Sequence, residues 1–125
     1  MSLLPKIIQT HGPVRHLRLC SGRDVFLSIE PDSYRMRLTD SSNHSLAQMC
    51  CRFEADTSCH VLCSFCVYRD CPKLQRPGIA RAAIVFYKEY YRCTLYYRPE
   101  AIQQASPQLH AFLRKMVEKG VLNEE

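Results

Sequence analysis

Four cysteines between positions 59 and 71 are the side chains best suited to chemistry in this sequence. Their spacing is Cys59-x3-Cys63-x2-Cys66-x4-Cys71. Structural zinc is held by four thiolate or imidazole ligands in a tetrahedron, and a closely spaced pair such as Cys63 and Cys66 commonly supplies two of them. The spacing therefore predicts a zinc site with Cys59, Cys63, Cys66 and Cys71 as its ligands.

The composition of this ligand set is left open by neighbouring residues. His60 adjoins Cys59, and Cys50 and Cys51 precede the group, so any of these three could replace a proposed ligand. Two other interpretations compete with zinc. Buried free cysteines behave as small apolar residues, and a redox-active CxxC of the thioredoxin type needs a parallel βαβ context that this sequence does not predict.

Basic side chains form a second group with a possible ligand. They are Arg15, Arg18, Arg35, Arg37, Lys73 and Arg76. Such side chains neutralise phosphates, and tyrosines such as Tyr90 and Tyr96 can stack on exposed bases. The pattern predicts a nucleic-acid interface. The competing interpretation is that arginines on an outer sheet face are simply hydrated and that tyrosines at helical spacing belong to the core.

Length, net charge and the motifs that the sequence lacks indicate the domain number, the kind of partner and whether an enzyme is expected. A chain of 125 residues is expected to form one domain, residues 1–125, and 46% hydrophobic residues argue against disorder throughout. The formal net charge of +5 favours an acidic partner such as nucleic acid. The sequence contains no Gly-rich phosphate loop, paired-carboxylate motif or dinucleotide fingerprint, so we expect no enzyme.

The sequence shows no targeting or membrane signal. The first ten residues hold only short apolar pairs interrupted by Pro5 and Lys6, unlike a secretory signal. No apolar run approaches the roughly 18 residues of a membrane span. We therefore expect an intracellular protein, cytoplasmic or nuclear, without a membrane partner. In such a reducing compartment the eight cysteines favour metal or free thiols over disulfides.

The elements that must position these groups follow from hydrophobic periodicity. Residues 14–19, 25–29 and 34–38 alternate apolar and polar side chains and predict a three-stranded antiparallel meander. Residues 46–54 predict a short helix with four apolar side chains inward, and Asp56, Thr57 or Ser58 is placed to cap another that bears the cysteines.

One long helix is predicted from residue 77 to residue 97, because apolar side chains recur there at steps of three and four. It would be roughly 30 Å long. Ser106 and Pro107 begin a final helix that Gly120 is placed to stop. The predicted fold class is α+β: an N-terminal antiparallel β-meander, a zinc-stapled middle, one long central helix and a C-terminal helix.

Self-association is expected from the aromatic side chains of the long helix. Tyr87, Tyr91 and Tyr96 lie off its apolar stripe, so the helix needs more cover than three strands provide. Pairing of two copies would supply that cover. A homo-oligomer is the expected state.

In overall character the chain resembles the small cysteine-rich accessory proteins of plant RNA viruses. The resemblance rests on a short basic chain, an irregular Cys/His group from Cys50 to Cys71, and the lack of a signal or enzyme signature. It implies zinc binding, binding to nucleic acid or a partner protein and, in many such proteins, suppression of host RNA silencing. The chain departs from the pattern in lacking a dense basic run beside the cysteines, which argues against a nucleolar-targeting role.

Two functional hypotheses follow. The first is a non-enzymatic, zinc-binding accessory protein of viral type that binds RNA or a host factor. The alternative is a homodimeric interaction adaptor that does not bind nucleic acid. Salt dependence of RNA binding would distinguish them, because phosphate contacts weaken steeply as the salt concentration rises.

Overall fold

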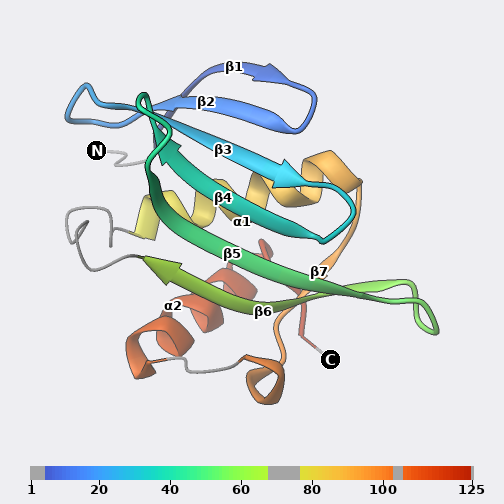
Figure 1. The fold of residues 1–125 in the computed structure, drawn as a ribbon. Coiled ribbons are helices and arrows are strands. Elements are labelled where there is room, and N and C mark those ends of the chain that lie inside the picture. Colours follow the sequence, from blue (N-terminus) through green and yellow to red (C-terminus); the bar gives the residue numbers. More distant parts are fainter. Residues whose placement is uncertain (1–4, 68–76, 103–105, 125) are drawn as a thin grey trace.

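A seven-stranded sheet that curls around a helix forms the centre of the protein (Figure 1). The computed structural model describes residues 5–67, 77–102 and 106–124. In chain order the elements are β1 (Lys6–His11), β2 (Val14–Arg18), β3 (Asp24–Glu30), β4 (Arg35–Asp40), β5 (Ser45–Glu54), β6 (Cys59–Val67), α1 (Pro77–Tyr91), β7 (Leu95–Tyr96), η2 (Pro99–Ala101) and α2 (Pro107–Glu118).

The sheet is a meander whose spatial order equals its sequence order. Strands β1 to β6 pair antiparallel, each with the next, as short connections allow. The two-residue turn between β1 and β2 begins with Gly12, whose φ of 55° suits glycine at that position of a hairpin turn. Strand β7 returns after α1 and pairs in parallel with β6, with His60 opposite Leu95 and Val61 opposite Tyr96.

The core lies between the inner face of the sheet and α1, which runs behind the strands in Figure 1. Alternate residues of each strand point to this side, so that one face of β2 to β6 is apolar. The buried residues include Leu17, Val25, Leu27, Met36, Leu38, Met49 and Leu62 from the sheet, and Ile79, Ala83, Ile84, Phe86 and Tyr87 from α1. Each such large side chain contributes about 1.5–3 kcal/mol through burial.

The C-terminal helix α2 lies where the sequence predicts it. Ser106 is the N-cap residue, and its side chain accepts a hydrogen bond from the backbone N–H of Leu109 at 3.1 Å. Leu113 and Met116 are buried and join the core. The chain leaves the helix through Gly120, whose φ is 76° and whose N–H donates to the carbonyl of Val117.

The predicted α+β fold, with a zinc-stapled middle and one long central helix, is wrong. The three strands of the predicted meander correspond to β2, β3 and β4. However, the two segments predicted as short helices form the long strands β5 and β6, of 10 and 9 residues, which extend the sheet beyond the predicted meander. Residues 59–67, which hold three of the four predicted ligands, are therefore extended and do not form the compact metal-binding segment that the prediction required.

The prediction of one long helix over residues 77–97 is also wrong, because α1 begins at Pro77 but ends at Tyr91. Arg92 has a φ of 50°, and the N–H of Cys93 donates to the carbonyl of Lys88 at 3.1 Å. A left-handed residue followed by a hydrogen bond to the carbonyl five residues back is a common way for a helix to end. The remaining residues turn back to the sheet, where Leu95 and Tyr96 form β7.

In the described parts of the chain, no helix combines the length and the apolar character that crossing a membrane requires.

Candidate nucleic-acid interface

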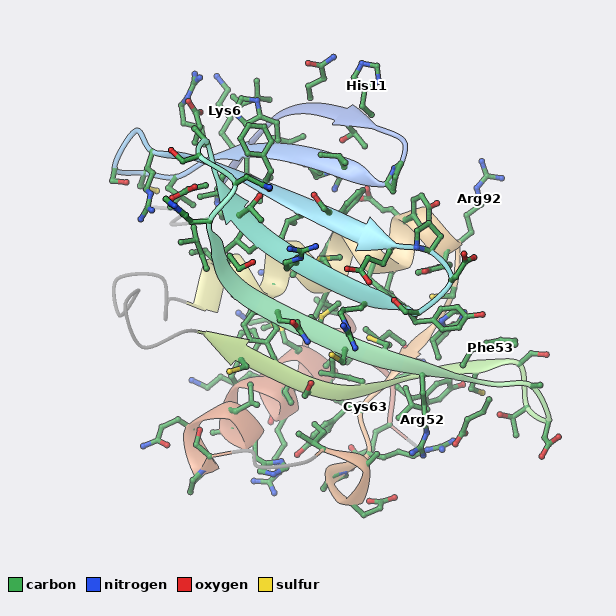
Figure 2. The ribbon with its side chains drawn as sticks, viewed as in Figure 1. Lys6, His11, Arg52, Phe53, Cys63 and Arg92 are labelled. Atoms are coloured by element: carbon green, nitrogen blue, oxygen red, sulfur yellow. The ribbon has the colours of Figure 1, made fainter. Side chains whose placement is uncertain are left out.

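The face of the sheet turned away from α1 is open along β2 to β5, and arginines are spread over it (Figure 2). Arg18, Arg35, Arg37 and Arg52 are all exposed. Each belongs to the outward set of its strand, because a neighbour in the sequence points into the core. The alternation that buries Met36 and Leu38, for example, turns Arg35 and Arg37 outward.

Two rings lie on the same outer face between these arginines. His16 of β2 is opposite Phe26 of β3 in the register, and their rings are stacked with centroids 4.6 Å apart and an interplanar angle of 20°. Both residues are partly exposed. Nε2 of His16 lies 3.0 Å from Oδ1 of Asp24, which fixes the orientation of the imidazole. The pair is therefore an oriented aromatic stack on an open surface, with one face of each ring turned toward the other ring.

Acidic neighbours partly neutralise the arginines of the outer face. Arg18 donates to Asp24 at 3.0 Å, and Arg37 lies 3.5 Å from Glu30. The hydrogen bonds from His16 and Arg18 hold the pKa of the Asp24 carboxyl below its usual range. Both ion pairs are largely exposed, and such pairs contribute only about 0–1 kcal/mol. Their arginines can therefore exchange a carboxylate for a phosphate at low cost.

Arg35 differs from these two, since it has no ion pair within the described part of the protein. It lies beside Glu30 in the β3–β4 register and beside Cys50 in the β4–β5 register. Glu30 contacts Arg37 instead, at a distance of 3.5 Å. Arg35 and Arg37 point the same way two residues apart, roughly 7 Å along the strand.

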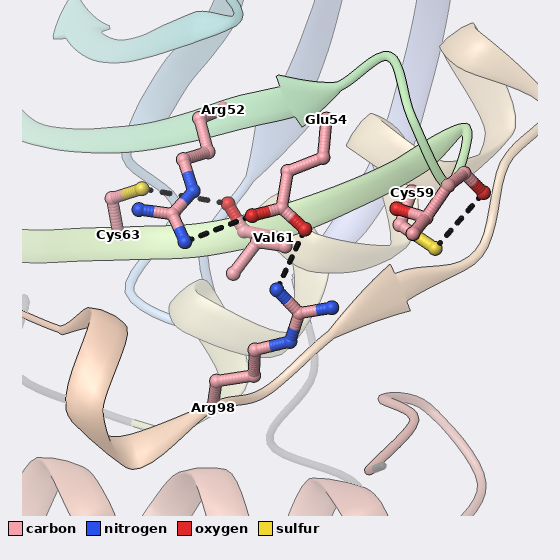
Figure 3. A network of polar contacts seen from close by, with 7 residues as sticks. Arg52, Glu54, Cys59, Val61, Cys63 and Arg98 are labelled. Atoms are coloured by element: carbon pink, nitrogen blue, oxygen red, sulfur yellow. Dashed lines mark hydrogen bonds and ion pairs between the residues drawn. The ribbon is translucent and has the colours of Figure 1, made fainter.

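Arg52 lies on this face near the end of β5 and takes part in a network of polar contacts that Figure 3 shows. Its Nη2 donates to Oε2 of Glu54 at 3.0 Å, and Nη1 of Arg98 donates to Oε1 of the same carboxylate at 2.6 Å. The bond from Arg98, and then that from Arg52, lowers the pKa of Glu54. The network ties the segment after β7 to β5.

Arg15 is separated from the other predicted basic residues. It lies on the inner face of β2, where it is 8% exposed and its guanidinium carbon is 4.6 Å from the ring centroid of Phe86. Its Nε donates to Oγ1 of Thr10 at 2.9 Å, and its Nη2 forms an ion pair with Glu89 of α1. Arg15 thus joins the sheet to α1. The other two predicted residues, Lys73 and Arg76, lie outside the described residues.

The predicted zinc ligands do not converge along the described chain. Cys59, Cys63 and Cys66 lie along β6, and at about 3.3 Å per residue the first and last are roughly 20 Å apart. Sulfur atoms that share a zinc ion are each only about 2.3 Å from it. Within residues 5–67, 77–102 and 106–124, no three His, Cys, Asp or Glu side chains are placed to hold a metal. Cys71 lies outside these ranges, so zinc binding stays a prediction.

His60, which the sequence offers as a replacement ligand, is turned to the inner face of β6. Its Nδ1 lies 2.7 Å from the hydroxyl of Tyr87, and the rings of Tyr34, Phe53, Tyr87 and Tyr91 surround it with centroids 5.0–5.6 Å away. Burial lowers the pKa of His60. Burial likewise raises the pKa of Cys51, whose thiol interacts with the same hydroxyl. This group is a polar chain inside the core.

The sequence predicts Arg18, Arg35 and Arg37 for this face, but it does not predict His16, Phe26 or Arg52. The stacked pair depends on the register of β2 against β3, which brings together residues ten apart in the chain. Arg52 is not predicted for this face, because the sequence predicts a helix over residues 46–54. Alternation of Met49, Cys51 and Phe53 was the available signal for an outward Arg52 on a strand.

By its geometry the protein is a small sheet protein of mainly antiparallel strands, with a helix on one side of the sheet and an open basic surface on the other. Comparisons with protein-family models, with curated proteins and with solved structures found no match for this chain. Function is therefore inferred from the residues of the face itself.

Proposed function

We propose that this protein is a non-enzymatic RNA-binding protein that holds single-stranded RNA across the outer face of β2 to β5. The observation that supports the proposal most directly is that Arg18, Arg35 and Arg37 share an uncovered sheet surface with the stacked rings of His16 and Phe26. This combination supplies phosphate contacts and a stacking platform on one face.

Two properties of these side chains favour RNA as the ligand. Arginines neutralise phosphates and release counterions, which provides affinity without sequence preference. Aromatic side chains stack on unpaired bases, and each such contact is worth about 1–3 kcal/mol. Single strands suit the face better than duplexes, because only unpaired bases can lie flat on the rings of His16 and Phe26.

The wider role belongs to the same proposal. An intracellular accessory protein of a plant RNA virus, as the resemblance implies, would meet RNA in the cytoplasm or nucleus, and suppression of host RNA silencing would be one use of such binding. A short duplex RNA is therefore included as a second probe.

Fluorescence anisotropy with a labelled short single-stranded RNA, measured at several salt concentrations, tests the proposal. The double variant Arg35→Ala/Arg37→Ala should weaken binding at least tenfold. It should also reduce the slope of log K against log salt by about 1.4, since each phosphate contact of a single strand contributes about 0.7. Arg114→Ala/Lys115→Ala is the matched control, because it removes the same charge from the exposed surface of α2.

A third variant, Phe26→Leu, keeps an apolar side chain on β3 but removes the stacking surface. It should weaken binding by about 1–3 kcal/mol with an unchanged salt slope. Equal effects of the outer-face pair and the α2 control would show that only net charge attracts RNA. No binding by folded wild-type protein at low salt would end the proposal.

The second candidate, a homodimeric adaptor without RNA binding, is favoured by the edge of the sheet at β1. All six residues of β1 are exposed, and this strand pairs only with β2. Ile7 and Ile8 are 54% and 37% exposed. An exposed edge strand with apolar side chains is a template for pairing with another chain.

Light scattering during size-exclusion chromatography tests this candidate. A dimer that Ile7→Lys converts to a folded monomer supports pairing through β1, because a charged edge resists pairing. Ala55→Lys adds the same charge at an exposed position of the β5–β6 turn, outside β1, and serves as the control. A wild-type monomer would remove the candidate.

A further inference from the structure

The paired strands β5 and β6 contain a β-bulge at a pair of cysteines. The register passes from Cys50 opposite Ser64 to Cys51 opposite Leu62, so Cys63 is the extra residue. In a bulge, two residues of one strand oppose one residue of the other. Cys63 and Ser64 therefore share Cys50 as their partner across the sheet.

Both thiols lie on the outer side of the sheet. Cys50 is directly opposite the exposed Arg35 of β4, and directly opposed residues share a face. Figure 3 shows the sulfur of Cys63 standing off β6 on the side of β5. The Sγ of Cys63 donates to the carbonyl of Val61 at 3.6 Å, while the Sγ of Cys50 accepts from Nε2 of Gln48 at 3.2 Å.

The spacing across the bulge suits a disulfide. Opposed residues of antiparallel strands have Cα atoms about 4.5–5.5 Å apart, and disulfides span Cα distances of about 4.4–6.8 Å. Both cysteines are free thiols of intermediate exposure. Burial raises the pKa of Cys63, Arg52 opposes this rise, and Cys50 adds to it, as expected of thiols that lie near each other.

The other described cysteines of β5 and β6 lie opposite residues of other types in the register. Cys51 is buried on the inner face, so its Cβ points away from the outer pair. Cys66 is opposite Gln48, and Cys59 is opposite Glu54. Among the described residues, Cys63 is the bulge residue next to Ser64, the register partner of Cys50, so these two cysteines are near neighbours on the outer side.

We propose that Cys50 and Cys63 form a redox-active dithiol that low-molecular-weight disulfides oxidise to a cross-strand disulfide. One thiolate attacks a sulfur of glutathione disulfide and releases one glutathione, which leaves a mixed disulfide on the protein. The second thiolate then attacks the protein sulfur of that mixed disulfide and releases the second glutathione. The protein loses two electrons and two protons, and glutathione disulfide gains them as two thiols. This inference is independent of RNA binding.

Native full-length protein, treated with a chelator and then with glutathione disulfide, tests the proposal by mass spectrometry. The expected product has lost two hydrogens, carries no glutathione and yields a Cys50–Cys63 cross-linked peptide on digestion. Cys50→Ser and Cys63→Ser should each lose this product completely and stop at the mixed disulfide. Cys20→Ser, an exposed cysteine in the β2–β3 connection, is the control and should form the product as wild type does.

Circular dichroism of each variant keeps the test clear, and Cys50→Ala replaces Cys50→Ser if the serine variant does not fold. Three outcomes would overturn the proposal: a cross-link that joins another pair such as Cys51 and Cys63, a mixed disulfide that never resolves in folded wild-type protein, or a persistent cross-link in the folded Cys50 variant. Loss of the product in both variants, with the control unchanged, would support it.

Discussion

Protonation of His60 should lower the stability of this protein as the pH decreases from 7 to about 5. The ring is 7% exposed, is enclosed by four aromatic rings and has no carboxylate in contact among the described residues. Burial disfavours the imidazolium and lowers the pKa of His60 below its usual 6.5. The folded protein therefore keeps His60 neutral where the unfolded chain already binds a proton.

The sign and size of the effect follow from this difference. A lowered folded-state pKa gives stability that is complete above pH 6.5 and is lost as the pH falls toward the folded-state pKa. One proton changes the free energy of unfolding by at most about 1.4 kcal/mol per pH unit. The lowered pKa values of Asp24, Asp40 and Glu54 act below their ordinary values of 3.8, 3.8 and 4.5, outside this interval.

Urea unfolding at constant ionic strength from pH 7 to pH 5 measures the effect. His60→Phe keeps an aromatic ring in the enclosure but cannot bind a proton, so its stability should change much less across this range. It should also be about 1–3 kcal/mol less stable at pH 7, because the Tyr87 hydroxyl loses its partner. His44→Gln, at a side chain 78% exposed, is the control and should retain the wild-type slope. An undiminished slope in His60→Phe would refute the reasoning.

Three further predictions concern the helix cap, the link between sheet and helix, and the metal. Ser106→Ala should cost about 1 kcal/mol in urea unfolding, since the N–H of Leu109 loses its acceptor; an unchanged midpoint would contradict the cap. Glu89→Gln should cost about 1 kcal/mol, limited because Glu89 is half exposed, and adding Arg15→Met should recover part of it; additive losses would show that the ion pair is unimportant. For zinc, elemental analysis tests the ligand prediction, whose Cys71 lies outside the described residues: one ion per chain would support it, and folded metal-free protein would refute it.

Local patterns were sufficient for part of the fold. The strands β2, β3 and β4 alternate apolar and polar residues with turn residues between them, and their positions follow from that alone. The start of α2 is marked by Ser106 and Pro107, which act through contacts within one turn. In each case the signal and the structure involve the same few residues.

The middle of the chain could not be assigned in this way. Leu46, Met49, Cys50 and Phe53 fit a helical stripe, but Ala47, Met49, Cys51 and Phe53 fit a strand equally well. Pairing with β4 on one side and β6 on the other decided the outcome, and that pairing is not a property of the segment itself. The end of α1 was missed because Arg92, not a glycine, adopts the left-handed conformation there.

The candidate interface was predictable to the extent that it is local. Arg35 and Arg37 are two residues apart on one strand, so their common face follows from alternation. Arg15 and Arg18 are three apart, which places them on opposite faces of β2, and this could have been recognised from the sequence. The stacking of His16 on Phe26 required the register and emerged with the structure.

The two-residue strand β7 has a consequence for synthesis of the protein. Translation delivers β1 to β6 first, whereas β6 gains its parallel neighbour only with Leu95 and Tyr96. That neighbour is itself fixed by Asn123, whose N–H donates to Leu95 at 3.0 Å and whose carbonyl accepts from Tyr97 at 2.8 Å. On a ribosome that stalls before residue 123, the nascent sheet therefore has an exposed edge at β6 beside His60. Nascent chains on neighbouring ribosomes can pair with this edge.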